Sequence, residues 1–228
     1  MRWERVCLET VAYHLPEERV SSDVLEARLE PLYTRWRMSP GQLVAMTGVK
    51  ERRWWPAGPR LADCAVLAAR KALQDSGVAP EDLGAVIYGG VCRDDLEPAT
   101  ACSVAAQLGV GADTLVLDHS NACLGVLNGI VTVANAIELG QIRAGLVVSA
   151  ESAREICKDT IARMLDDGGL QTWGRCLATL TGGSGAIAVV LTERDFSFTQ
   201  RRLLGGAVRA APQHHRIARW GSREGLLG

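Results

Sequence analysis

The chain has 228 residues, a net charge of −1 at pH 7, and 47% hydrophobic against 22% charged residues. This length can bury a sizeable core, and the nearly neutral charge gives no electrostatic reason to expect nucleic acid or an anionic membrane as a partner. The seven cysteines are scattered, with no C-x-x-C pair and no Cys/His cluster, so neither a metal site nor a disulfide framework is predicted. We therefore expect a protein of the reducing cytoplasm.

The sequence predicts a soluble protein without a membrane span. Its first residues lack the apolar stretch of a signal peptide. The longest apolar run, residues 124–139, is interrupted by Asn128, Asn135 and Glu138. This run is also too short to cross a bilayer comfortably.

The N-terminal part of the chain predicts one strand and two short helical regions. Residues 6–14 are a predicted strand, and residues 22–36 are a predicted helix that Pro31 kinks or ends. The segment 39–42, Ser-Pro-Gly-Gln, resembles a capping box, which predicts a further short helix that ends near Gly48.

The middle of the chain alternates predicted helices and strands. Apolar or small residues recur with a helical period over 61–76, and Gly77 follows as a C-cap. Pro98 is predicted to open a helix that runs through Leu108 and stops at Gly109. The other predicted segments are strands at 85–88, 114–118, 146–149 and 186–191 and helices at 123–139 and 154–165. This alternation predicts an α/β fold with a mostly parallel sheet covered by helices.

Cys123 lies at the junction between the predicted strand 114–118 and the long apolar helix. A thiol at the start of a helix faces the positive end of the helix dipole, which favours the thiolate. Because the thiolate is the nucleophile, this placement predicts covalent catalysis; the alternative is a buried structural cysteine. The helix is apolar on nearly every face, so it needs cover on both sides, from a sheet and from either a second sheet or another chain.

Four segments give the chain a family resemblance. They are 47–52 (TGVKER), 93–100 (RDDLEPAT), 121–125 (NACLG) and 182–186 (GGSGA). The first, third and fourth resemble the T-G-I-x-x-R segment, the nucleophile region and the glycine-rich turn of thiolase-superfamily condensing enzymes, the ketoacyl synthase III group. The second resembles the R-D-x-L-E-P-[ST]-T segment of the OleA-type acyl-CoA condensing enzymes of bacterial long-chain olefin synthesis.

The resemblance implies a fold, a reaction and two catalytic residues. The fold would be the thiolase-like layered αβαβα arrangement, with 1–195 as its N-terminal half and 196–228 as the start of a truncated C-terminal half that opens with a strand at 203–210. In OleA-type enzymes a cysteine takes a fatty acyl group from coenzyme A. A glutamate lent across a dimer interface then acts as base in a non-decarboxylative Claisen condensation. By position, these roles fall on Cys123 and Glu97.

The resemblance also implies partners. We expect a homodimer that acts on acyl-CoA or acyl-carrier-protein thioesters, with no metal and no further cofactor. Gln42 and Met46 stand where initiating ketoacyl synthases carry a tryptophan and an arginine near coenzyme A. This difference weakens the interpretation as a short-chain initiation enzyme and leaves the coenzyme A contacts unassigned.

Alternatives stay open for the residues. Glu97 precedes Pro98, and its charge could simply complement the N-terminus of the following helix. His119 could be the base for Cys123, although a packing or loop role is expected. Cys92 and Cys102 are expected to be small core residues.

Alternatives stay open for the function as well. Within the enzymes, the alternative is a decarboxylative 3-oxoacyl-[acyl-carrier-protein] synthase III. The remaining active-site histidine and asparagine of the family belong to its second half. The alternative from another class is therefore an inactive half-protein that serves as a partner subunit.

Overall fold

The computed structural model describes residues 1–216, which fall into two units. Unit 1 comprises Met1–Leu15, Gly58–Glu151 and Gly185–Val208. Unit 2 comprises Pro16–Ala57 and Ser152–Ser184, together with the described residues that follow Val208. The proposed division at residue 195 is a family division of the sequence and is independent of these units.

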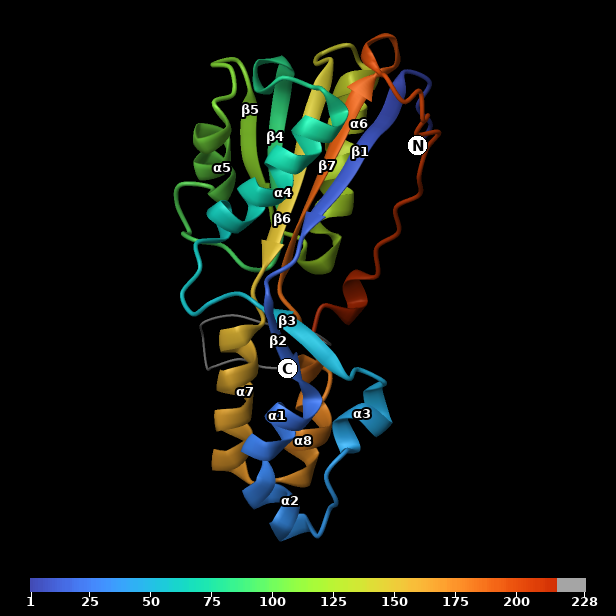
Figure 1. Ribbon diagram of the computed structural model, residues 1–228. Coiled ribbons are helices and arrows are strands. Elements are labelled where there is room, and N and C mark those ends of the chain that lie inside the picture. Colours follow the sequence, from blue (N-terminus) through green and yellow to red (C-terminus); the bar gives the residue numbers. More distant parts are fainter. Residues whose placement is uncertain (217–228) are drawn as a thin grey trace. The chain divides into compact units, whose positions relative to one another are not determined.

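Unit 1 is built on a five-stranded mixed sheet (Figure 1). The strand order is β1 (Val6–His14), β7 (Gly185–Glu193), β6 (Ala144–Glu151), β4 (Leu83–Gly89) and β5 (Leu115–His119). Strand β4 is parallel to both β5 and β6, whereas β7 is antiparallel to both β6 and β1. The change from parallel to antiparallel pairing occurs between β6 and β7. Between these strands the chain passes through residues 152–184 of unit 2, whereas a parallel strand is usually reached through one crossover helix.

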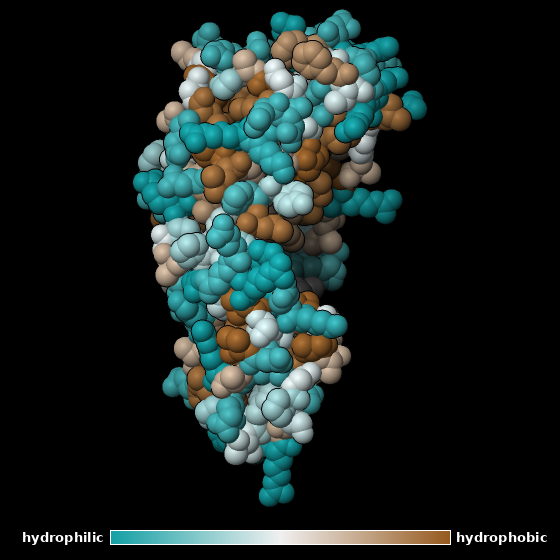
Figure 2. Space-filling view, viewed as in Figure 1, coloured by the Kyte–Doolittle hydropathy of each residue, from teal (hydrophilic) through white to brown (hydrophobic). Residues whose placement is uncertain are grey.

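Three helices flank this sheet, with α4 (Leu61–Ser76) and α5 (Thr100–Leu108) on one face and α6 (Gly125–Glu138) on the other (Figure 1). The prediction for 61–76 is confirmed, including Gly77 as C-cap with φ 68°. The exposed positions of α4 are polar except for Leu67, and its side of the unit presents a mixture of polar and apolar residues (Figure 2). This face has the composition of an ordinary protein surface.

The opposite side of unit 1 is different. Helix α6 packs one face on the sheet through residues that include Gly129, Val133 and Ile137. Its other face leaves Leu127 57% exposed, and Leu124 and Leu139 at its two ends are 49% and 72% exposed. The expectation that the sheet covers only one side of this helix is confirmed. The apolar second side is open within the described residues.

The described part of unit 2 holds the antiparallel pair β2 (Glu18–Ser21) and β3 (Glu51–Trp54) with five α-helices. These are α1 (Ser22–Arg28), α2 (Glu30–Trp36), α3 (Gln42–Thr47), α7 (Arg154–Asp167) and α8 (Leu170–Cys176). Their buried core includes Leu25, Leu29, Trp54, Met164 and Trp173. The predicted break in the first helical region is confirmed: α1 ends before Leu29, and Pro31 lies in the first turn of α2, where proline is tolerated.

The predicted capping box at residues 39–42 is wrong. Helix α3 begins after Gly41, and no side chain of the segment caps it; Gln42 Nε2 instead donates to the Ser39 carbonyl at 3.1 Å. The cap is the buried carboxylate of Glu26, which accepts the N–H groups of Gly41 and Leu43. This carboxylate comes from another helix, so local sequence could not reveal it.

The predicted strand at 203–210 is also wrong. Single bridges pair Arg2 with Gly205 and Cys7 with Arg202, and no regular strand forms. The segment follows the start of β1 through Leu203 N to Val6 O at 2.9 Å, but the Gly205-Gly206 pair adds little strand propensity. Residues 217–228 of the predicted second half lie outside the described residues. No helix among the described ones has the length and apolarity needed to cross a membrane.

Candidate active site

Cys123 lies in the turn between β5 and α6. This turn includes one 3-10 segment, Ala122–Leu124, and α6 itself begins at Gly125. The sequence predicted that the cysteine opens the helix, whereas in the structure it precedes the helix. Ala122 has φ 45°, in the left-handed region that non-glycine residues seldom adopt. The Cys123 side chain is exposed, so the alternative of a buried structural cysteine does not apply here.

Two glycines set the position of this turn. An added Cβ on Gly125 would lie 2.8 Å from the carbonyl carbon of Gly89 and 2.9 Å from the nitrogen of Gly90. Conversely, a Cβ on Gly89 would lie 2.4 Å from the carbonyl carbon of Gly125. The first residue of α6 thus packs backbone to backbone against the carboxyl end of β4. This contact explains why glycine follows Cys123-Leu124 in the sequence.

Gly125→Ala is therefore expected to destabilise the protein by about 3 kcal/mol, because the methyl group meets backbone atoms that cannot move aside. The free energy of unfolding in urea measures this. Gly174→Ala is the control, since a Cβ on this helical glycine meets nothing within 4 Å, and it should stabilise the helix by about 0.5–1 kcal/mol. Equal effects of the two substitutions would contradict the packing argument.

A side-chain hydrogen bond also fastens the turn to the helix. Asn121 Nδ2 donates to Asn128 Oδ1 at 2.5 Å. In the sequence alone, Asn128 is only an interruption of an apolar run. The signal for this contact is a polar residue about two helical turns after Asn121 on a largely apolar helix.

Glu97 lies in an exposed stretch of the loop between β4 and α5. Residues 95–98 are all exposed, and Leu96 is 93% exposed. Among the described residues, the Glu97 carboxylate has no hydrogen bond or ion pair. Hydrogen bonds within the described part of one chain therefore do not link the two predicted catalytic residues.

The alternative role for Glu97 at a helix N-terminus is wrong. Helix α5 begins at Thr100, so Pro98 does not occupy its first turn. The free N–H groups of Thr100 and Ala101 instead donate to the carboxylate of Asp118, each at 2.9 Å. Asp118 comes from β5, and its carboxylate supplies the negative charge at the N-terminus of α5.

A family model and several known proteins match this chain. Residues 57–166 match the family model of the thiolase N-terminal domain. The chain is 54% identical over 227 residues to the acyl-CoA:acyl-CoA alkyltransferase of Shewanella oneidensis and 33% identical over 220 residues to that of Xanthomonas campestris. A crystal structure of a Xanthomonas campestris OleA variant superposes with a TM-score of 0.87 at 31% identity, covering 95% of this chain and 67% of that one. The chain belongs to the OleA-like group of the thiolase superfamily.

Family membership confirms the resemblance that the four motifs carried and the predicted α/β thiolase-like fold. A second OleA structure, with its cysteine replaced by alanine, gives a TM-score of 0.91 at 32% identity. The alignment with the Shewanella relative includes 98% of this chain, and the alignment with the Xanthomonas relative includes 96%. The chain nevertheless spans only 65% of the length of each relative. What the whole OleA-like proteins do is therefore assigned to this chain only as a proposal.

The other thiols contrast with Cys123. Cys92 is buried as expected, but the same expectation for Cys102 is wrong, since it lies on the exposed side of α5. Burial raises the pKa of Cys64 and of Cys157 to about 11. These two thiols therefore stay protonated and unreactive near neutral pH.

His119 is not linked to Cys123 by a hydrogen bond among the described residues. It ends β5 and is half-buried. Among residues 1–216, no three side chains of the metal-ligating types gather in one place.

Proposed function

We propose that this chain carries the acyl-accepting site of an OleA-type acyltransferase that joins two fatty acyl-CoA molecules by a non-decarboxylative Claisen condensation. The observation that carries the proposal is the 54% identity, over 98% of the chain, to an acyl-CoA:acyl-CoA alkyltransferase. The exposed thiol of Cys123, in a turn fixed against β4, supports the assignment of the nucleophile.

The proposed chemistry has two steps. The Cys123 thiolate attacks the thioester carbonyl of the first acyl-CoA, forms an acyl-cysteine and releases coenzyme A as its thiolate, which takes a proton from water. Glu97 then removes an α-proton from the second acyl-CoA, and the carbanion attacks the acyl-cysteine carbonyl. The Cys123–acyl bond breaks, the thiolate is regenerated, and the product is a β-ketoacyl-CoA.

Solved structures of the Xanthomonas OleA support this pair of residues. They include variants at a cysteine and at a glutamate, separated in that protein by the same number of positions as Cys123 and Glu97 here. They also include variants at a histidine whose separation from the cysteine exceeds the number of residues that follow Cys123 in this chain. A counterpart at that separation is therefore not among these 228 residues.

A homodimer is part of the proposal, since Glu97 would act in the site of a partner copy. Two observations support it. The Glu97 carboxylate is exposed and has no partner among the described residues. Among residues 1–216, strand β5 pairs with β4 alone and its Leu115 is 52% exposed, so its other edge could pair with a second chain.

The remaining parts of the proposal concern the second half and the compartment. The open apolar side of α6 is the surface that a second thiolase-like half would cover, which supports 1–195 as a first half and 196–228 as the start of a second. All seven cysteines are free thiols, which supports the cytoplasm.

The experiment is intact-mass analysis of the chain after incubation with palmitoyl-CoA, with peptide mapping of the adduct and detection of the β-ketoacyl product. One palmitoyl group on Cys123 together with product is the expected result. An adduct without product would contradict the condensation step. No adduct at all would favour the inactive partner subunit over an enzyme.

A decarboxylative synthase is the second candidate, because the chain is also 32% identical over 174 residues to a β-ketoacyl-[acyl-carrier-protein] synthase III of Rhodospirillum centenum. Such an enzyme would form its carbanion by loss of carbon dioxide from a malonyl thioester. In this case Glu97 would not be needed as a base, and replacing it discriminates between the two candidates.

A further inference from the structure

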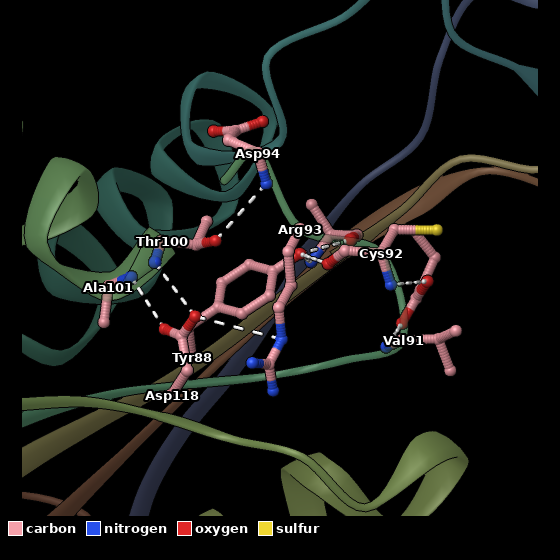
Figure 3. Close-up of polar contacts among 10 residues, drawn as sticks. Tyr88, Val91, Cys92, Arg93, Asp94, Thr100, Ala101 and Asp118 are labelled. Carbon is pink, nitrogen blue, oxygen red and sulfur yellow. Dashed lines mark hydrogen bonds and ion pairs between the residues drawn. The ribbon is translucent and has the colours of Figure 1, made fainter. Parts of the chain in front are cut away.

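The loop that carries Glu97 is fixed at its base while its middle is exposed. At its start, the Glu151 carboxylate accepts the N–H groups of Val91 and Cys92 at 2.6 and 3.1 Å. The hydroxyl of Tyr88, on β4, lies 2.8 Å from the Cys92 carbonyl (Figure 3). The exposed residues 95–98 therefore extend from a loop whose first residues are fixed to the sheet.

The middle of the loop is tied to α4. The Asp94 carboxylate accepts the N–H groups of Leu61 and Ala62, the first residues of α4, at 2.6 and 3.0 Å. The backbone N–H of Asp94 in turn donates to Thr100 Oγ1 at 3.4 Å (Figure 3). Asp94 thus caps the N-terminus of α4.

Asp118 holds the far end of the loop, and it does so from another strand. Its two oxygens accept the N–H groups of Thr100 and Ala101, and its Oδ2 lies 4.0 Å from Nε of Arg93, at the other end of the loop (Figure 3). The Asp118 side chain is only 7% exposed. Arg93 Nη2 is buried without a hydrogen-bond partner among the described residues. Asp118 therefore provides both the acceptors and the nearby negative charge at this point.

We infer that Asp118 is a positioning residue for the proposed condensation. It lies on β5, the strand that leads into the Cys123 turn, and it binds both ends of the loop that carries Glu97. One carboxylate thus sets the path of the base-bearing loop relative to the strand that carries the nucleophile. The expected fall in kcat rests on the proposed function. The expected loosening of the loop does not.

A carboxylate is the group that this position requires. Two converging backbone N–H groups need two acceptors, and the guanidinium and the N-terminus of α5 both favour a negative charge. The amide of asparagine offers one acceptor oxygen, and its NH₂ group would face an N–H donor. Asp118→Asn is therefore expected to loosen the loop at its junction with α5 while it keeps the size of the side chain.

The test compares Asp118→Asn with Glu138→Gln. Glu138, at the end of α6, also accepts two consecutive backbone N–H groups, those of Glu4 and Arg5, at 3.0 and 2.9 Å. It lies at the opposite end of the helix from the Cys123 turn. The control therefore removes the same kind of carboxylate contact from the same unit without touching the loop.

Three measurements are made on both variants: hydrogen exchange of the peptides that cover 91–101, the rate of acylation of Cys123 by palmitoyl-CoA, and kcat and KM for condensation. In Asp118→Asn, exchange of the loop peptides should rise while that of α4 is unchanged. Acylation should stay within about threefold of wild type, and kcat should fall about a hundredfold with little change in KM. Glu138→Gln should change none of these.

Two results would overturn the inference. One is unchanged exchange over 91–101 in Asp118→Asn. The other is a parallel loss of acylation and condensation that follows the loss of thermal stability in both variants, which would mark Asp118 as structural only. If the wild-type chain forms no β-ketoacyl product, the proposed function fails, and the exchange measurement alone decides whether Asp118 holds the loop.

Discussion

The Cys123→Ala protein is expected to form no acyl adduct and no β-ketoacyl product from palmitoyl-CoA. Alanine keeps the backbone of the turn and removes the sulfur that would carry the acyl group. Because the Cys123 side chain is exposed, the free energy of unfolding should change by no more than about 0.5 kcal/mol. Intact-mass analysis and thermal unfolding together separate a lost nucleophile from a lost fold.

Cys102→Ser is the matched control, since Cys102 is the other exposed cysteine of the chain. This variant should keep both the adduct and the product.

The five remaining thiols are buried. With pKa values of about 11, Cys64 and Cys157 hold very little thiolate at pH 8. Their labelling by iodoacetamide should rise only as the pH approaches 11. An adduct that persists in Cys123→Ala near neutral pH would contradict the assignment.

Elements whose ends are set by local residues could be predicted from the sequence. Helix α4 follows its apolar period to the residue, because Gly77 ends it in the left-handed conformation. The caps of α3 and α5 could not be predicted from the sequence, for a common reason. The caps are Glu26 and Asp118, which lie in other elements and reach these helices only in the folded chain. A pattern read along one segment contains no information about such partners.

Some features of the candidate site could likewise be predicted from local sequence, and others could not. The nucleophile motif and the apolar character of α6 placed Cys123 in a strand-to-helix turn, and both features are local. The contact between Gly89 and Gly125 is not local, since it depends on how closely α6 approaches β4. For Asp118, the sequence did contain a signal: an acidic residue that directly follows three apolar residues of a strand. Because a buried acid needs donors, such a residue predicts backbone or cationic partners.

Replacement of the proposed base gives the second large effect. Glu97→Gln should keep acylation of Cys123 by palmitoyl-CoA, because that step needs only the thiolate and a good leaving group. Condensation of two acyl-CoA molecules should fall by about 10²–10⁴-fold, since glutamine cannot take the α-proton. The exposed position of Glu97 predicts little effect on the free energy of unfolding. Mass analysis follows the first step, and chromatography of the β-ketoacyl product follows the second.

Asp95→Asn is the control for this variant, because it neutralises another exposed acid of the same loop and should leave both steps intact.

A mixed sample of Glu97→Gln and Cys123→Ala chains tests whether Glu97 acts across the dimer. If Glu97 acts in the site of the partner copy, heterodimers combine one intact thiol with one intact glutamate from the other chain, and part of the activity should return. Glu97→Gln chains that condense acyl-CoA at the wild-type rate would exclude Glu97 as the base. A wild-type chain that condenses malonyl-acyl-carrier protein but not two acyl-CoA molecules, and that keeps this activity as Glu97→Gln, would favour the decarboxylative synthase, because loss of carbon dioxide then supplies the carbanion.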